Sequence, residues 1–196
     1  MIAKHPATVE DLYRVPDGGK AEIVNGELVL MSPTGIKPGR AGGKIYASLQ
    51  VFEDEHGGGC AIPDNVGFLV DLPGRTSFSP DAGWYVGDAD DMHFARGAPA
   101  FAVEVRSEGD YGPTAERAIA AKIEDYFAAG TQVVWDVDLL SDDVIRVYRA
   151  VNPDAIDVFR RGETADAEPA VPGWRFPVDR LLKRPGAGEL EESDER

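Results

Sequence analysis

The stretch AFAVEVRSEGD, residues 100–110, decides the fold of this chain. It begins as a buried strand, rich in alanine, valine and phenylalanine, but Glu104 stands in the middle of it. An ionised carboxylate is costly to bury unless a cation or several hydrogen-bond donors meet it. We therefore expect a core strand that carries an acid whose partner comes from elsewhere in the chain.

A second acid enters the preceding apolar stretch, SFSPDAGWYV at residues 77–86, where Asp81 follows Pro80. If the two strands are adjacent, Asp81 and Glu104 face each other, and two close carboxylates repel unless they share a proton or a cation. Hard oxygen ligands of this kind suit magnesium or manganese. Alternation along the later strand puts two sets of residues on opposite faces, Phe101, Val103 and Val105 on one and Ala102, Glu104 and Arg106 on the other.

The third charged group comes from a predicted helix, TAERAIAAKIEDYFAAG at residues 114–130, with Thr114 as its cap and Gly130 as its stop. Lys122 lies at the margin of the apolar stripe of this helix, so we expect its ammonium to reach the carboxylates. A divalent ion beside a positioned ammonium is a familiar arrangement for hydrolysing a phosphodiester.

The other patterns predict a mixed α/β fold, in which helices pack on a mixed sheet. Asn25-Gly26 between two apolar runs predicts a type I′ hairpin near the N-terminus. We expect one domain over residues 1–184 and a disordered acidic tail over 185–196. The remaining predicted elements are helices at 8–16 and 41–56 and strands at 65–72, 131–138 and 142–151.

Composition limits the classes of function. The 196 residues are 43% hydrophobic, contain one cysteine and show no apolar run long enough for a signal peptide or membrane span, so we expect a soluble, cytoplasmic protein without a membrane partner. A net charge of −15 argues against a protein that coats nucleic acid. An enzyme can still confine its basic groups to one cleft. KPGRAGGK, residues 37–44, offers Arg40 and Lys44 for weak, salt-sensitive contacts to DNA phosphates, or is an ordinary mobile loop.

Five blocks carry a resemblance to a known family: AEIVNGEL, GRAGGKIYASL, SPDAGWYV, FAVEVRSEGD and AAKIEDYFAAGTQVVWDVD. In this order they resemble the Uma-type "putative restriction endonuclease" family of bacteria, within the PD-(D/E)XK nuclease superfamily. The resemblance covers roughly residues 8–151. It implies a restriction-endonuclease-like mixed sheet core flanked by helices, with an N-terminal β-hairpin extension, and metal-dependent cleavage of DNA.

On the pattern of this family, Asp81 and Glu104 bind Mg²⁺ or Mn²⁺, Lys122 is the catalytic cation and Glu22 is an accessory acid. We expect the Val105 carbonyl to be a further metal ligand. Two positions depart from the pattern. Arg106 occupies the classical lysine position, where it can stabilise negative charge on the nucleic acid but accepts a proton poorly. Pro38 stands where the family usually has a histidine.

Other interpretations remain open at this stage. Glu104 can be a structural acid paired only with Arg106, Asp81 a turn residue, Lys122 a solvated lysine, and Glu22 an acid that faces water. At the level of the protein, the alternative to a DNA endonuclease is a non-catalytic nucleic-acid-binding or assembly module with a vestigial metal site. A nuclease for RNA or branched DNA is a third possibility, and the sequence leaves open whether the chain forms a homodimer.

Overall fold

The computed structural model describes residues 5–16 and 19–182, so the predicted acidic tail lies outside the described residues. Its helices are α1 (Val9–Tyr13), α2 (Ile36–His56), α3 (Pro113–Ala128) and α4 (Asp179–Leu182). None of these helices within the described ranges is long and apolar enough to cross a membrane.

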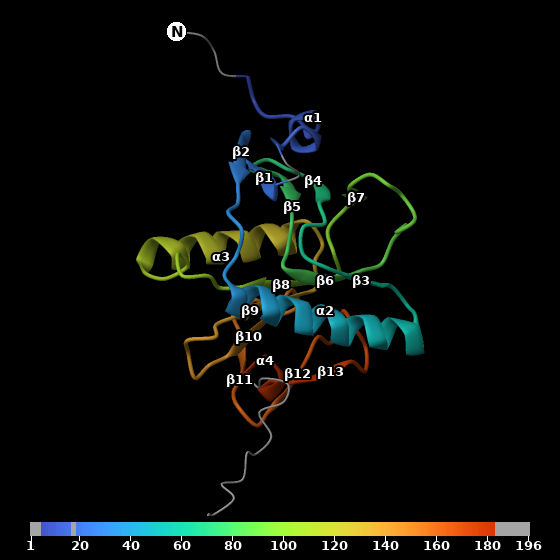
Figure 1. Cartoon of the computed structure of the whole chain (residues 1–196), viewed down its shortest axis with the longest axis vertical. Helices are drawn as coiled ribbons and strands as arrows, with labels where there is room; N and C mark the ends of the chain where they lie inside the picture. Colours follow the sequence, from blue (N-terminus) through green and yellow to red (C-terminus); the bar gives the residue numbers. More distant parts are fainter. Residues whose placement is uncertain (1–4, 17–18, 183–196) are drawn as a thin grey trace, which may run out of the picture.

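A six-stranded sheet forms the centre of the molecule (Figure 1). Its strands β8 and β9 run parallel, with α3 as the connection between them, while all other neighbours are antiparallel. Two parallel strands start at the same end of the sheet. The chain must therefore cross back from the end of β8 to the start of β9, and α3 makes this crossover. The sheet order is β11 (Asp157–Phe159), β10 (Ile145–Arg149), β9 (Val133–Val137), β8 (Phe101–Val105), β6 (Ala82–Tyr85) and β3 (Cys60–Ile62).

A five-stranded sheet contains the predicted hairpin. Asn25 and Gly26 turn the chain with φ of 51° and 73°, the positive values that a type I′ turn requires. Strand β1 also pairs with β5, so the hairpin continues into a larger sheet. Its order is β2 (Glu27–Leu30), β1 (Ala21–Val24), β5 (Arg75–Phe78), β4 (Phe68–Leu72) and β7 (Ala95–Arg96). A separate pair, β12 (Thr164–Asp166) and β13 (Arg175–Pro177), lies near α4 at the lower end of Figure 1.

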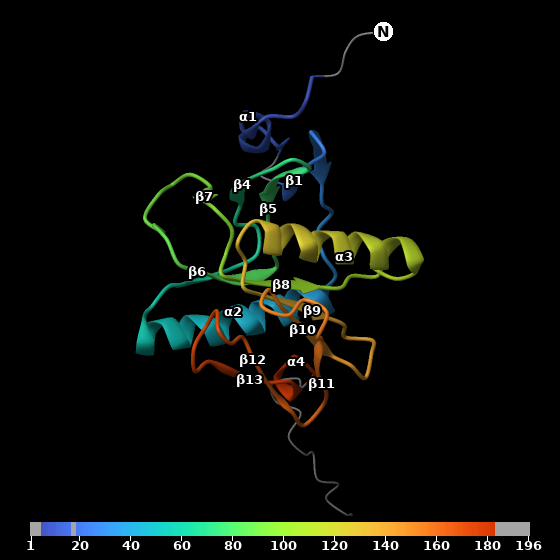
Figure 2. The ribbon, with the colours of Figure 1, turned by 180° about the vertical axis from the view of Figure 1, so that it is seen from behind.

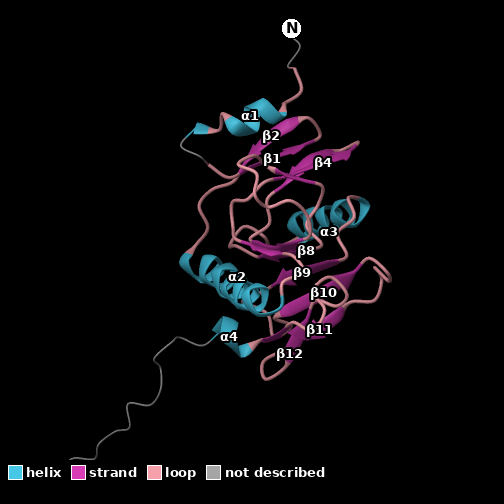
Figure 3. Ribbon diagram, turned by 90° about the vertical axis from the view of Figure 1, so that its right-hand side faces the viewer, coloured by secondary structure: helices cyan, strands magenta, loops and turns pink. Residues whose placement is uncertain are grey.

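The central sheet is covered on both faces, which confirms the predicted mixed α/β fold with flanking helices. Figure 3 shows α2 and α3 on opposite sides of β8 and β9, and Figure 2 shows α3 beside the five-stranded sheet. The side chains of β8 alternate as predicted. Phe101, Val103 and Val105 pack in the cluster that contains residues of α2, whereas Ala102 packs in the cluster with Ile123 of α3. Glu104 therefore lies on the α3 side.

Three local predictions were wrong, and a proline lies at each of the three places. Residues 37–44 are not a loop, because α2 begins at Ile36 and carries Pro38 in its first turn, where a missing N–H costs little. Residues 77–86 form two strands in different sheets, separated at Pro80. Thr114 does not cap α3: Gly112 is the cap, and Pro113 takes the first helical position that suits proline.

Candidate functional site

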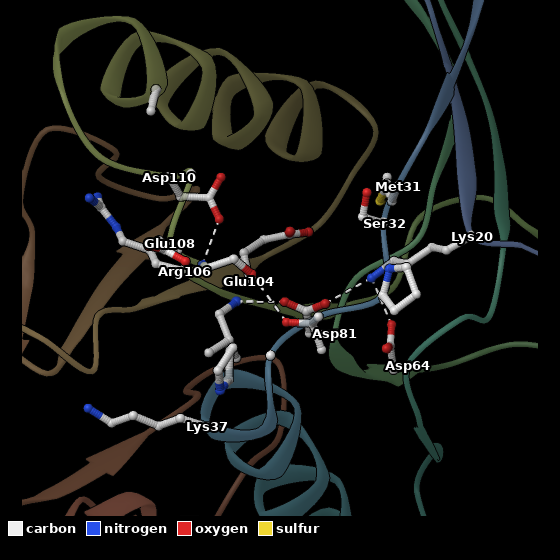
Figure 4. A pocket seen from close by; sticks show the side chains of 18 of the residues that line it. Lys20, Met31, Ser32, Lys37, Asp64, Asp81, Glu104, Arg106, Glu108 and Asp110 are labelled. Carbon is white, nitrogen blue, oxygen red and sulfur yellow. Dashed lines mark hydrogen bonds and ion pairs between the residues drawn. The ribbon is translucent and has the colours of Figure 1, made fainter.

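A cavity of about 1030 Å³ opens between the central sheet, α3 and the segment that leads into α2. Five of the predicted site residues line it together: Asp81, Glu104, Val105, Arg106 and Lys122. Figure 4 shows Asp81 and Glu104 side by side in this cavity, with Lys20 approaching from the side of β1.

The pairing of β6 with β8 brings the two acids together. Ala82 lies opposite Val103, so Asp81, one residue earlier, lies across from Glu104. The Asp81 N–H donates to the Val103 carbonyl at 2.9 Å, and the Asp81 carboxylate accepts the Val105 N–H at 2.8 Å. These bonds to a buried strand orient Asp81, so the interpretation of Asp81 as a free turn residue is not supported by its contacts.

Lys122 bridges two carboxylates rather than facing solvent. Its Nζ lies 2.9 Å from Glu104 Oε2 and 3.0 Å from Glu22 Oε1, and only 19% of its side chain is exposed. Burial alone would lower the pKa of Lys122, but the two carboxylates raise it overall. The ammonium therefore stays charged near neutral pH and serves as a fixed cation instead of a proton acceptor.

Glu22 does not face water, because it is only 3% exposed. Besides Lys122, it accepts a hydrogen bond from Arg75 Nη1 at 2.7 Å and from the Ser79 N–H at 2.9 Å. Burial opposes ionisation, but the two cations and this N–H lower the pKa of Glu22 overall. Glu22 is thus an ionised anchor that joins the five-stranded sheet to the site.

Glu104 has the opposite balance. Burial raises its pKa, and the nearby carboxylates of Asp81 and Glu22 raise it further, against the opposing effect of Lys122. The hydroxyl of Tyr126 donates to Glu104 Oε1 at 2.6 Å. Two neighbouring acids whose pKa values are shifted in opposite directions are typical of a functional site.

Two contacts of this site were missed by the sequence analysis. Tyr126 belongs to the apolar stripe of the predicted helix and was not expected to contact an acid, although its position four residues after Lys122 places both on the same helical face. Lys20 precedes β1, and its Nζ lies 2.7 Å from Asp64 Oδ1 and 2.8 Å from Asp81 Oδ1. No sequence signal points to Lys20, since its partners lie 44 and 61 residues away.

Arg106 lines the cavity but is paired with residues other than Glu104. Its Nε and Nη2 each donate to Asp136 at 2.7 Å, and Nη1 and Nη2 donate to the two oxygens of Glu116. The predicted structural pair of Glu104 with Arg106 is therefore replaced by pairs from β9 and α3. A contact of Arg106 with nucleic acid stays a prediction.

The two basic residues predicted from KPGRAGGK lie on α2. Arg40 is exposed, and Lys44 is partly buried, with its Nζ donating to the Leu181 carbonyl at 3.3 Å. Partial burial lowers the pKa of Lys44, and the nearby cations Arg40 and Arg180 lower it further. Among the described residues that line the cavity, α2 contributes Lys37 but neither Arg40 nor Lys44. Their role as phosphate contacts stays a prediction.

The donors available to a metal ion are few but chemically suitable. Within the described residues, no three histidine, cysteine, aspartate or glutamate side chains converge as a metal site. A divalent ion would therefore rest on Asp81 and Glu104, with backbone oxygen or water completing its shell. Carboxylate oxygens are the ligands that Mg²⁺ prefers. Burial first, and then the neighbouring carboxylates of Asp81 and Glu22, raise the pKa of Glu104. The residues present fit such an ion.

Comparisons with known proteins agree with the fold. Residues 7–179 match the model of the Uma2 family, described as "Putative restriction endonuclease". No curated protein matches the chain. A solved structure, described as "a putative nuclease belonging to DUF820 from Anabaena variabilis ATCC 29413", is similar with a TM-score of 0.69 and 16% identity. The similarity covers 90% of this chain and 98% of that chain. Because the family model spans most of its length, the chain belongs to the Uma2 family.

Proposed function

We propose that this protein is a divalent-metal-dependent endonuclease that hydrolyses phosphodiester bonds of DNA. The observation that carries this proposal is the meeting of Asp81, Glu104 and Lys122 in one open cavity, two acids and a permanent cation from three different elements. Membership of a family described as "Putative restriction endonuclease" supports the nuclease class. Asp81, Glu104 and the Val105 carbonyl would hold the ion, which is Mg²⁺ or Mn²⁺.

The residues of the site divide the work of hydrolysis. A divalent ion held by Asp81 and Glu104 would supply Lewis acidity to the phosphate and would activate a water molecule. Lys122 holds a positive charge where negative charge develops on the phosphate, which favours the transition state over the ground state. Tyr126 orients Glu104 through its hydroxyl, and Glu22 keeps the Lys122 ammonium in place from the opposite side.

DNA that approaches this site would meet a protein of negative net charge. Arg40 and Lys44 on α2 are the proposed phosphate contacts. Arg106 is a further proposed contact through its guanidinium donors, although Asp136 and Glu116 offset its charge. Because these cations are few against a net charge of −15, we expect binding that is weak and salt-sensitive.

One observation favours a second candidate, a binding or assembly module with a vestigial metal site. Both acids already have protein donors on each oxygen: Lys20 and the Val105 N–H on Asp81, and Lys122 and Tyr126 on Glu104. Such a set of donors satisfies the carboxylates without a metal ion. Cleavage measurements with matched variants separate the two functions.

The test measures cleavage of supercoiled and single-stranded DNA with Mg²⁺ or Mn²⁺. We expect Lys122→Ala to keep metal binding and most DNA affinity but to lose at least about a hundredfold in cleavage rate, as groups that act on developing charge do. Lys122→Arg should rescue little, because arginine has a different shape and exchanges protons poorly. Arg117→Ala, an exposed cation on the same helix, is the matched control.

Asp81→Asn is the companion variant, since it keeps the shape of the side chain while weakening a metal ligand, and it should be equally inactive. Thermal unfolding of each variant checks that the fold is retained. The nuclease proposal fails if the parent cleaves no form of DNA or RNA with either metal. It also fails if Asp81→Asn and Lys122→Ala cleave like the parent, and the binding-module function would then replace it.

A further inference from the structure

Lys20 is a cation held at Asp81, the proposed metal ligand. The three residues of this contact come from separate parts of the chain: Lys20 precedes β1, Asp64 follows β3 and Asp81 precedes β6. The side chain of Lys20 is only 16% exposed, although it lines the cavity. Figure 4 shows its ammonium between the two carboxylates.

The Lys20 ammonium occupies a carboxylate oxygen of Asp81 that a divalent ion would bind. Asp81 Oδ2 accepts the Val105 N–H at 2.8 Å, and Oδ1 accepts Lys20 at 2.8 Å. A divalent ion that binds Oδ1 comes within a few ångströms of the ammonium, and like charges at this distance repel strongly in a partly buried site. Binding of the ion to Asp81 and retention of Lys20 on Asp81 therefore oppose each other.

Asp64 is a second ion-pair partner for Lys20. Its Oδ1 lies 2.7 Å from the Lys20 Nζ, and its side chain is 49% exposed, compared with 24% for Asp81. Because Asp64 already shares the ammonium, Lys20 can leave Asp81 without becoming unpaired. The geometry suits an exchange, in which the Lys20 ammonium moves toward the more exposed Asp64 as a divalent ion binds Asp81.

We propose that Lys20 is a built-in counter-cation of Asp81, which competes with the divalent ion for this carboxylate and is retained by Asp64 when the ion binds. Lys20 then sets the metal affinity of the site, and Asp64 is a positioning residue for Lys20. This inference rests on the proposed function, since it concerns the same metal ligand.

Calorimetric titration with MnCl₂, without nucleic acid, tests the exchange. We expect Lys20→Met to bind Mn²⁺ about tenfold more tightly than the parent, because the competitor is gone. Lys20→Gln, which keeps a donor but no charge, should behave alike and serves if the methionine variant does not fold. Asp64→Asn should bind Mn²⁺ several-fold more weakly, because Lys20 then has Asp81 as its remaining acidic partner among these contacts.

Lys37→Met is the matched control, because Lys37 lines the same cavity but donates to the Leu139 carbonyl instead of Asp81. Its Mn²⁺ affinity should stay within about twofold of the parent. An equal rise in Mn²⁺ affinity in Lys37→Met and Lys20→Met would overturn the inference. The rise would then follow from the loss of any positive charge near the cavity. Unchanged affinity in both Lys20 variants would overturn it and leave the metal-dependent nuclease standing. Absence of Mn²⁺ binding in the parent and in both Lys20 variants would overturn the metal site and the exchange together.

Discussion

Glu22 and Glu104 contact the same ammonium, yet their pKa values are shifted in opposite directions. Glu22 has Arg75 and the Ser79 N–H in addition to Lys122, so its ionised form is favoured despite burial. Glu104 lies beside other carboxylates and keeps a raised pKa. The surroundings of Glu22 thus favour its ionised form, whereas the surroundings of Glu104 disfavour its ionised form.

Neutral substitutions at these two acids should therefore have opposite effects on stability. At pH 7 we expect Glu22→Gln to lower the free energy of unfolding by about 3 kcal/mol, since it leaves Arg75 and Lys122 without a shared buried anion. Glu104→Gln should raise the free energy of unfolding by about 1 kcal/mol. Urea unfolding of the parent and both variants measures the difference.

The two effects also depend on pH in a defined way. The pKa of Glu22 is lowered from 4.5, so its stabilisation is present above that value and is lost as pH falls through the folded-state pKa. The pKa of Glu104 is raised from 4.5, so its destabilisation is complete above the folded-state pKa and disappears below 4.5. The free energies of unfolding of both variants should thus approach that of the parent at acidic pH. A change of both free energies in the same direction at pH 7 would contradict this assignment.

At the scale of elements, helix α2 passes directly over the start of β6. A Cβ atom at Gly42 would lie 3.1 Å from the Asp81 carbonyl oxygen and 3.5 Å from the Asp81 Cβ. The backbone at Asp81 cannot easily move away from α2, because the Asp81 N–H donates a hydrogen bond to the Val103 carbonyl of β8. A cluster of glycines inside a helix is unfavourable on propensity alone, so the close approach explains the residue at this position.

Two neighbouring glycines provide a matched pair of variants. Gly43→Ala meets nothing within 4 Å and should raise the free energy of unfolding by about 1 kcal/mol through helix propensity. Gly42→Ala should lose that gain and weaken Mn²⁺ binding several-fold, because the added methyl group pushes on Asp81. Thermal unfolding and calorimetry measure both quantities. Equal stabilisation and unchanged metal binding in the two variants would show that α2 does not position Asp81.

At the scale of the whole molecule, charge is distributed unevenly. The chain carries 35 acidic against 20 basic residues, yet Arg40, Lys44 and Arg180 lie near one another on α2 and α4. Partial burial lowers the pKa of Lys44, and the two arginines lower it further. Such a local basic surface on an acidic protein permits contact with a polyanion in one orientation and repels it elsewhere.

We expect the double variant Arg40→Ala with Lys44→Ala to weaken DNA binding and to reduce the slope of log affinity against log salt by about 2 units, one for each lost phosphate contact. Fluorescence anisotropy with a duplex over a salt titration measures this slope. The control is Arg14→Ala with Arg117→Ala, which removes the same charge from two exposed positions, one directly after α1 and one on α3. If the two double variants respond alike, α2 does not contact DNA.

The sequence by itself determined the central features of the site. Alternation along β8 assigned Glu104 to one face, and the stripe of α3 assigned Lys122 to the margin that meets it, because both periods depend only on local backbone geometry. The proline-aspartate step predicted a second acid on the neighbouring strand, and β6 does pair with β8. The hairpin at Asn25-Gly26 followed from turn chemistry alone.

Only the tertiary structure decided which charges meet. Lys20 reaches Asp81 across 61 residues of sequence, and Glu22 is buried because β1 pairs with β5 and presents it to Arg75. Arg106, a local neighbour of Glu104, turns instead to Asp136 on the adjacent parallel strand. The physical reason is that local periodicity specifies the face of an element, whereas the partner of a buried charge is set by long-range strand pairing and by the need to satisfy every ionised group at once.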